Sequence, residues 1–205
     1  MNNANRLDSP LRVFAVVGSL GRTSAVGLAI HAVANELRKT GCEVDLLDLA
    51  TTPLPLFNPE TTYQAPGYPA LKECAERADV FLLGTPDYHG CMSGAMKNFL
   101  DHFWREFGGK LFASVVSGYD KGLTVADQIR TVARQCYAWS IPYTVSLSDR
   151  EDVRDGDLTP EFLGHKVEML ARDIRVYGNL LAGQRQRDLT GVEPGFLAKW
   201  RGPKA

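Results

Sequence analysis

Glycine, hydroxyl and arginine residues gather at positions 18–24 (GSLGRTS), between an apolar run at 12–17 and a helical pattern. Free backbone N–H groups and the positive dipole end of a helix N-terminus favour a bound anion. Four side chains could add hydrogen bonds or positive charge: Ser19, Arg22, Thr23 and Ser24. The spacing is neither G-x-G-x-x-G nor G-x-x-x-x-G-K-[ST], which disfavours a Rossmann dinucleotide site and a Walker loop. Alternatively, Ser24 only caps the helix and the glycines form the turn.

A second candidate binding loop lies at residues 85–90 (TPDYHG), directly after the apolar run at 79–84. Pro86 fixes its own φ angle and stiffens the loop, and Gly90 lets the backbone approach a planar ligand closely. Two side chains could lie against a ring or donate to its edge: Tyr88 and His89. The alternative is that both face solvent.

The helix that follows begins with Ser93 as its expected N-cap. Its polar residues either extend the site or form an ordinary solvated, ion-paired face: Lys97, Asn98 and Asp101. We expect His102 and Trp104 to pack rather than react.

Five short apolar runs recur along the chain, and amphipathic segments separate them; the runs begin near Arg12, Glu43, Asp79, Lys110 and Ile141. Strands buried on both faces of a parallel sheet have this near-continuous apolar character. The last helical pattern, over 163–181, is preceded by Thr159 as cap and Pro160 in the first turn. The sequence therefore predicts a doubly wound α/β fold with a five-stranded parallel sheet in the order 2-1-3-4-5.

In that order, the loops after the first, third and fourth strands lie side by side, and the loop after the second does not join them. The fourth strand ends at Ser117 and leads into a third glycine-flanked turn at 118–122 (GYDKG). One loop suits an anion and another a flat ring, so the three together predict a flavin nucleotide site. No metal site and no catalytic acid–base pair are expected.

We expect one domain over residues 1–182 and a tail over 183–205 that is either disordered or an arm packing on a second subunit. The proline-rich stretch from residue 51 to 59 either covers the sheet edge or shapes the rim of the site.

The composition narrows the functional classes. The 205 residues are 44% apolar and carry a net charge of −1, without a basic cluster, which argues against nucleic-acid binding. The near-neutral balance also disfavours an electron carrier with a strongly acidic docking face. No apolar stretch is long enough to cross a bilayer, and the first ten residues lack the apolar middle of a signal peptide. Four dispersed cysteines argue against disulfides and structural zinc, so we expect a cytoplasmic protein.

The motifs G-S-x-x-x-x-S, T-P-D-Y-H-G-x-x-S-G-x-x-K-N-x-x-D and S-G-Y over residues 12–146 resemble those of the flavodoxin-like NAD(P)H-dependent FMN reductases. The resemblance implies non-covalent FMN and a homodimer or homotetramer. It also implies FMN contacts from the following residues: Ser19, Ser24, Pro86, Asp87, Tyr88, His89, Gly90, Ser117, Gly118 and Tyr119. The sequence departs from the family pattern at Gly21, where an arginine is frequent, and at Val26, which is often polar.

The predicted activity is reduction of bound flavin by NADPH or NADH, followed by electron transfer to a second small molecule. A free flavin, a quinone, an azo compound or a metal oxyanion could serve as this acceptor. Hydride transfer between stacked rings needs positioning and a polarised flavin, which fits the lack of a catalytic dyad. Two alternatives remain: a dehydrogenase of a small biosynthetic intermediate, and a non-enzymatic electron carrier. Three arginines either contact the nicotinamide ribose or, as the favoured alternative, are ordinary surface charges of helices: Arg105, Arg130 and Arg134.

Overall fold

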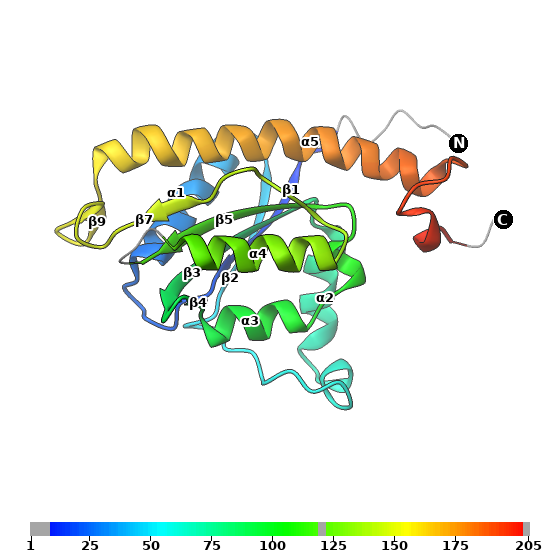
Figure 1. The fold of residues 1–205 in the computed structure, drawn as a ribbon, viewed down its shortest axis with the longest axis horizontal. Helices are drawn as coiled ribbons and strands as arrows, with labels where there is room; N and C mark the ends of the chain where they lie inside the picture. Colours follow the sequence, from blue (N-terminus) through cyan, green and yellow to red (C-terminus); the bar gives the residue numbers. More distant parts are fainter. Residues whose placement is uncertain (1–8, 119–121, 203–205) are drawn as a thin grey trace.

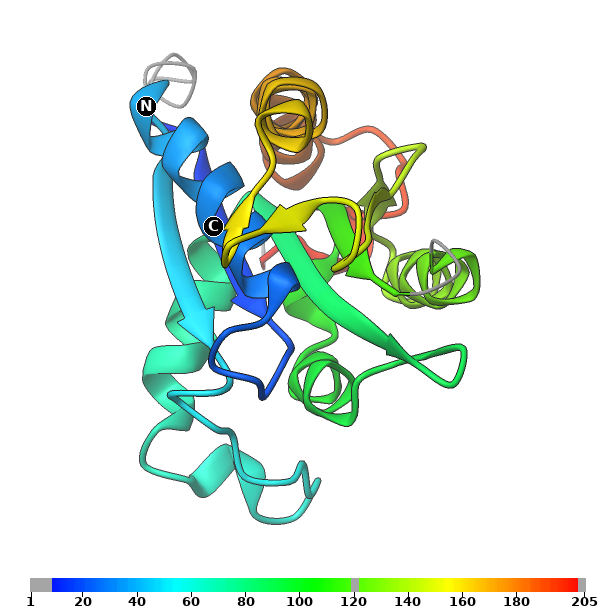
Figure 2. The ribbon, with the colours of Figure 1, turned by 90° about the vertical axis from the view of Figure 1, so that its left-hand side faces the viewer.

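The computed structural model describes residues 9–118 and 122–202 as a parallel sheet between two layers of helices (Figures 1 and 2). The sheet order is β2-β1-β3-β5, followed by two short strands that both pair with β5. The strands are β1 (Arg12–Val17), β2 (Glu43–Asp48), β3 (Val80–Tyr88), β5 (Leu111–Ser117), β6 (Trp139–Ser140) and β7 (Val145–Leu147). The predicted order 2-1-3-4-5 is confirmed, but the count of five continuous strands is wrong.

The fifth position of the sheet is divided between β6 and β7. Ile141 still donates its N–H to Phe112 O at 3.0 Å, but the next residue, Pro142, has no N–H to donate. Pairing with β5 resumes at Val145. A proline inside the predicted strand is therefore the physical reason for the break.

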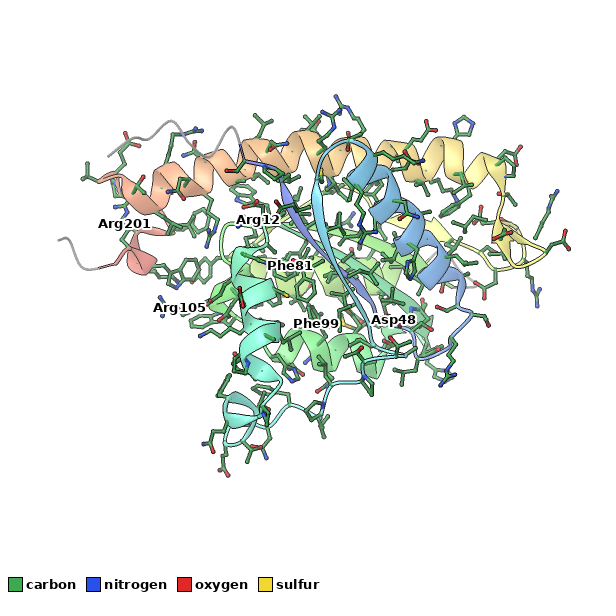
Figure 3. All side chains as sticks on the ribbon, turned by 180° about the vertical axis from the view of Figure 1, so that it is seen from behind. Arg12, Asp48, Phe81, Phe99, Arg105 and Arg201 are labelled. Atoms are coloured by element: carbon green, nitrogen blue, oxygen red, sulfur yellow. The ribbon has the colours of Figure 1, made fainter. Side chains whose placement is uncertain are left out.

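Alternate residues of each central strand face opposite helix layers. Val13 and Ala15 of β1 pack with helices α1 and α5, whereas Phe14 and Val16 pack against α2, α3 and α4. The helices are α1 (Ala25–Lys39), α2 (Tyr68–Arg77), α3 (Gly94–Asp101), α4 (Leu123–Gln135) and α5 (Glu168–Thr190). Figure 3 labels Phe81 on β3 and Phe99 on α3, whose rings lie in the core between the sheet and helices α2, α3 and α4.

Short elements complete the fold. Strand β4 (Cys91–Met92) returns antiparallel to the end of β3, and β8 (Val153–Arg154) pairs with β9 (Asp157–Leu158). Thr159 accepts from Phe162 N at 3.3 Å and so acts as the predicted cap of the last helix. That helix opens with π-helical turns, η3 (Phe162–Val167), before α5. The 3₁₀ turns are η1 (Thr62–Gln64), η2 (Arg105–Phe107) and η4 (Ala198–Trp200).

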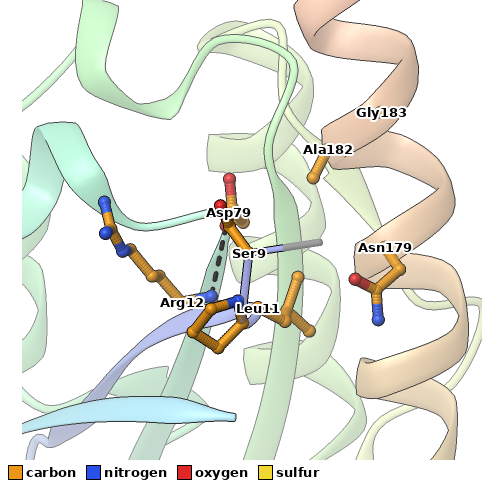
Figure 4. A pocket seen from close by; sticks show the side chains of 8 residues that line it. Ser9, Leu11, Arg12, Asp79, Asn179, Ala182 and Gly183 are labelled. Atoms are coloured by element: carbon orange, nitrogen blue, oxygen red, sulfur yellow. Dashed lines mark hydrogen bonds between the residues drawn. The ribbon is translucent and has the colours of Figure 1, made fainter. Parts of the chain in front are cut away.

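At the amino ends of the strands, Asp79 fixes the start of the sheet. Its carboxylate accepts from Arg12 N at 3.1 Å, next to a small cavity of about 70 Å³ (Figure 4). This cavity lies at the opposite end of the sheet from the loops predicted to bind a ligand.

Helix α5 continues through residue 182 to Thr190, so the first part of the expected tail is helical. Beyond it, Leu197 is only 1% exposed, and Trp200 lies so close to Gly108 that a side chain there would collide with the indole. The described part of the tail therefore packs on its own chain. Within the residues described, every helix is too short or too polar to span a lipid bilayer.

Candidate cofactor site

A cavity of about 280 Å³ opens at the carboxyl edge of the sheet. Strand register explains why these loops meet, because Pro86 of β3 pairs with Ser117 of β5, which in turn pairs with Leu147 of β7. Seven of the predicted site residues line the cavity: Ser19, Ser24, Pro86, Asp87, Tyr88, Ser117 and Gly118. None of the described lining residues comes from the loop after β2, as expected from the strand order.

The loop after β1 supplies two hydroxyl groups to the cavity. Ser24 caps α1 by accepting from Gly27 N at 3.1 Å, and Ser19 accepts from Gly21 N at 3.2 Å. The two predicted roles of Ser24, helix cap and site residue, are therefore compatible. Arg22 and Thr23 are exposed and are not among the residues that line the cavity.

Ser93 joins the first and second loops. Its hydroxyl donates to Gly18 O and accepts from Met96 N at 3.0 Å, which confirms it as the N-cap of α3. Its own N–H donates to Thr85 Oγ1 at 3.0 Å. Gly18 N in turn donates to Gly84 O at 2.7 Å. These bonds fix the spacing of the two loops before any ligand binds.

Residues 85–88 are a continuation of β3, where the sequence predicted a kinked loop. The reason is that a residue before proline prefers extended geometry. Pro86 itself, which has no N–H, is compatible with a strand where no neighbouring strand needs that donor. The chain reverses at His89 and Gly90, whose φ angles are 59° and 76°. Two successive positive φ angles are typical of a two-residue hairpin turn.

The turn of this hairpin lies against α4, where Gln128 donates to Gly90 O at 2.9 Å. The side chain of Asp87 accepts from Gly90 N at 2.7 Å and so shapes the turn. His89 and Gly90, both predicted to touch the ring, do not line the cavity, whereas Tyr88 lines it and is 55% exposed. The turn carries its backbone toward α4 instead, which explains the difference.

The third loop approaches the second without space for a side chain. A Cβ atom on Gly118 would lie 2.8 Å from Asp87 Cβ, closer than side chains tolerate. Gly118 N donates to Leu147 O at 3.1 Å, which continues the sheet past the end of β5. Tyr119, the remaining predicted contact, lies outside the described residues.

Comparison with known proteins identifies the family. Residues 11–152 match the NADPH-dependent FMN reductase family. The chain belongs to this family. It is 38% identical over 136 residues to an NADPH azoreductase of Bacillus sp. (strain OY1-2), covering 64% of this chain and 73% of the relative. It is 25% identical over 150 residues to an FMN-dependent NADPH-azoreductase of Staphylococcus aureus, covering 69% and 79%.

Solved structures agree with this fold. FerB, a flavoenzyme NAD(P)H:(acceptor) oxidoreductase from Paracoccus denitrificans, superposes with a TM-score of 0.68 at 21% identity, over 83% of this chain and 98% of that chain. A flavodoxin from the domain Archaea gives 0.60 at 14% identity, covering 82% and 99%. The predicted resemblance is confirmed, and this FMN reductase family member is an FMN-dependent oxidoreductase that uses NAD(P)H.

A fourth loop of this FMN reductase, after β7, also borders the cavity and was not predicted from the sequence. Three of its residues line the cavity beside the predicted ones: Ser148, Asp149 and Arg150. They follow the fifth apolar run at its carboxyl end, so the same rule that selected the other loops would have found them. Arg150 thus brings a guanidinium to the cavity wall, where the sequence had assigned that role to Arg22.

Gln128 was also missed, and it holds the hairpin from behind. Its side-chain amide donates to Gly90 O at 2.9 Å and accepts from Met92 N at 3.0 Å. No sequence pattern marks this residue, because its partners are 36 and 38 positions away along the chain. Within the described residues, no cluster of His, Cys, Asp or Glu side chains is arranged to hold a metal ion.

Proposed function

We propose that this protein is an NADPH-dependent azoreductase whose FMN binds in the cavity at the carboxyl edge of the sheet. The azo acceptor is supported by the 38% identical relative, which is named an NADPH azoreductase. Free flavins and quinones are further acceptors of the same kind, since all are planar and accept electrons.

The donor groups of the cavity suit FMN. Ser19 and Ser24 would bind the phosphate near the N-terminus of α1, with Arg150 supplying positive charge. Pro86, Tyr88 and Gly118 would lie along the ring, because two of these residues have no polar side chain and the third is aromatic. FMN held in this way supplies reversible hydride transfer.

The residues of the cavity contribute positioning rather than proton transfer. Tyr88 is more than half exposed, so one side of the cavity is open to solvent. We propose that nicotinamide and acceptor occupy this open side in turn. Cleaving one azo bond into two amines requires four electrons and four protons, so each bond consumes two NADPH and two protons from solvent.

The test is an anaerobic titration of the FMN-loaded protein. Adding NADPH should bleach the flavin absorbance, and adding methyl red should restore it while consuming the dye. In turnover, two NADPH should disappear per methyl red. Retained flavin colour after addition of both NADPH and NADH would exclude the reductase activity, and bleaching without dye consumption would exclude only the azo acceptor.

We also propose that the protein is a cytoplasmic homodimer or homotetramer. The family resemblance supports the oligomer, and the composition of the chain supports the location. Sedimentation equilibrium of the FMN-loaded protein would measure the number of subunits directly.

A further inference from the structure

A second, larger cavity of about 550 Å³ lies on the face of the sheet covered by α2 and α3. It is open to solvent on one side and bordered by β1, β2, the proline-rich loop and α2, and much of its wall is apolar, including Phe14, Leu46 and Leu71. Within the described part of the chain it shares no lining residue with the cofactor cavity. Cavities of roughly 300–1,000 Å³ with apolar walls and few polar groups are typical small-molecule sites.

Two buried polar residues line this cavity, Thr62 and His102, and His102 is only 3% exposed. Its Nδ1 lies 2.7 Å from Asn98 O. A carbonyl oxygen can only accept, so Nδ1 carries a proton, and in the neutral ring Nε2 is therefore an acceptor.

The Nε2 atom of His102 has no hydrogen-bond partner among residues 9–118 and 122–202. In the same part of the chain, no side-chain nitrogen or oxygen is both fully buried and without a partner. Nε2 is therefore accessible. Because the ring lines the cavity and is otherwise covered, the cavity is where this acceptor is exposed.

Two other polar side chains that line the cavity already have hydrogen-bond partners. Asp45 accepts from Arg77 Nε at 2.9 Å, so its charge is neutralised by a neighbour. Thr62 accepts from Asn58 N at 2.8 Å. His102 is thus the deep acceptor left for a ligand.

The wall formed by the proline-rich loop is fixed in place before any ligand binds. Asn98 on α3 accepts from Phe57 N at 2.7 Å and donates to Pro55 O at 3.0 Å. The ring of His102 also packs edge-on against Phe57, with centroids 5.5 Å apart. A preformed cavity binds a ligand without an additional ordering cost.

We propose that this cavity binds an uncharged aromatic molecule with a single hydrogen-bond donor, a phenol or an arylamine, whose O–H or N–H donates to His102 Nε2. The apolar wall excludes charged compounds because a charge there would lose its hydration. The acceptor selects against the plain hydrocarbon, which would leave Nε2 without a partner. This inference does not depend on which compound accepts electrons from the flavin.

The experiment compares p-cresol with p-xylene, which has the same shape but a methyl group in place of the hydroxyl. Binding to the FMN-loaded protein is measured by calorimetry and ligand-observed NMR. We expect p-cresol to bind roughly fivefold more tightly, the effect of one buried hydrogen bond. Equal affinities, or no binding of p-cresol, would overturn the proposal.

Two variants locate the site. His102→Phe keeps a ring but removes the acceptor, so p-cresol should bind no better than p-xylene. Ala70→Trp fills the cavity from the surface of α2, where Ala70 is exposed, and should abolish binding of both compounds. FMN affinity should be unchanged in Ala70→Trp. If a second copy of the chain covers the cavity instead, p-cresol will not bind and Ala70→Trp will change the number of subunits, and this result contradicts the proposal.

Discussion

The side-chain amide of Gln128 donates to Gly90 O at 2.9 Å. The oxygen of the same side chain accepts from Met92 N on the returning strand. One residue of α4 therefore bonds to the turn and to the returning strand of the hairpin whose outgoing strand carries Tyr88 into the cavity. Besides this contact, the turn is held by Asp87, which accepts from Gly90 N at 2.7 Å, while His89 at the tip is exposed.

We predict that Gln128→Glu weakens FMN binding about fivefold, the effect of one lost hydrogen bond of about 1 kcal/mol. The carboxylate keeps an acceptor for Met92 N but has no N–H for Gly90 O. Fluorescence titration of FMN into the apoprotein measures the affinity. Gln135→Glu, an exposed change on the same helix, is the matched control and should bind FMN normally. Equal affinities for the two variants would show that the hairpin does not depend on this contact.

Alanine substitutions at Gly118 and Gly21 form a second matched pair of variants. An added Cβ would lie 2.8 Å from Asp87 Cβ at Gly118, but 3.6 Å from its nearest neighbour, Ser19 Oγ, at Gly21. We expect Gly118→Ala to push the second and third loops apart and to weaken FMN binding roughly tenfold or more, as a displacement of the loops removes ring contacts. Gly21→Ala should remain within about twofold of the wild type. Fluorescence titration measures the FMN dissociation constant of each variant. A similar loss of FMN affinity in both variants would contradict the steric explanation.

Lys110 is a buried structural cation. It is 1% exposed, and its ammonium donates to Ala75 O at 2.6 Å and to Glu76 O at 2.7 Å, at the C-terminal end of α2. Lys110→Met leaves these carbonyls without their charged donor, and we expect the free energy of unfolding to fall by about 2–3 kcal/mol. Lys72→Met removes only an exposed pair with Glu76 and should cost less than about 0.5 kcal/mol. Urea unfolding measures both, and a loss below 1 kcal/mol for Lys110→Met would contradict this role.

Alkaline pH should destabilise the fold through Tyr68. Burial, and then the nearby Glu106 carboxylate, raise the pKa of its phenol from 10.0 to about 12. The folded state thus favours the neutral phenol. This contribution is fully present below pH 10 and is lost as the pH rises from 10 through 12. The free energy of unfolding should therefore decline less over this range in Tyr68→Phe than in the wild type. Parallel declines for the two proteins would exclude this cause.

Local sequence patterns predicted the layers of the fold and the edge of the sheet at which we propose the cofactor site. Apolar runs and helical spacing predicted the α/β alternation, because burial of alternate strand residues and of one helix face is visible in short windows. The loops at the carboxyl ends of the strands followed from the strand order alone. Ser24 and Ser93 were predictable as helix caps for the same reason, since a cap bonds to residues three positions away.

Contacts between distant segments could only be decided by the tertiary structure. Arg150 rather than Arg22 lines the cavity, and Asn98 holds the proline-rich loop 41 residues earlier in the chain. The hydrogen-bond partner of a side-chain amide depends on which backbone segment lies beside it. The spacing of residues in the sequence does not show which distant segment that is. The cavity of His102 has the same origin, because its walls come from strands β1 and β2, the proline-rich loop, helix α2 and the end of α3, which meet only when the sheet is assembled.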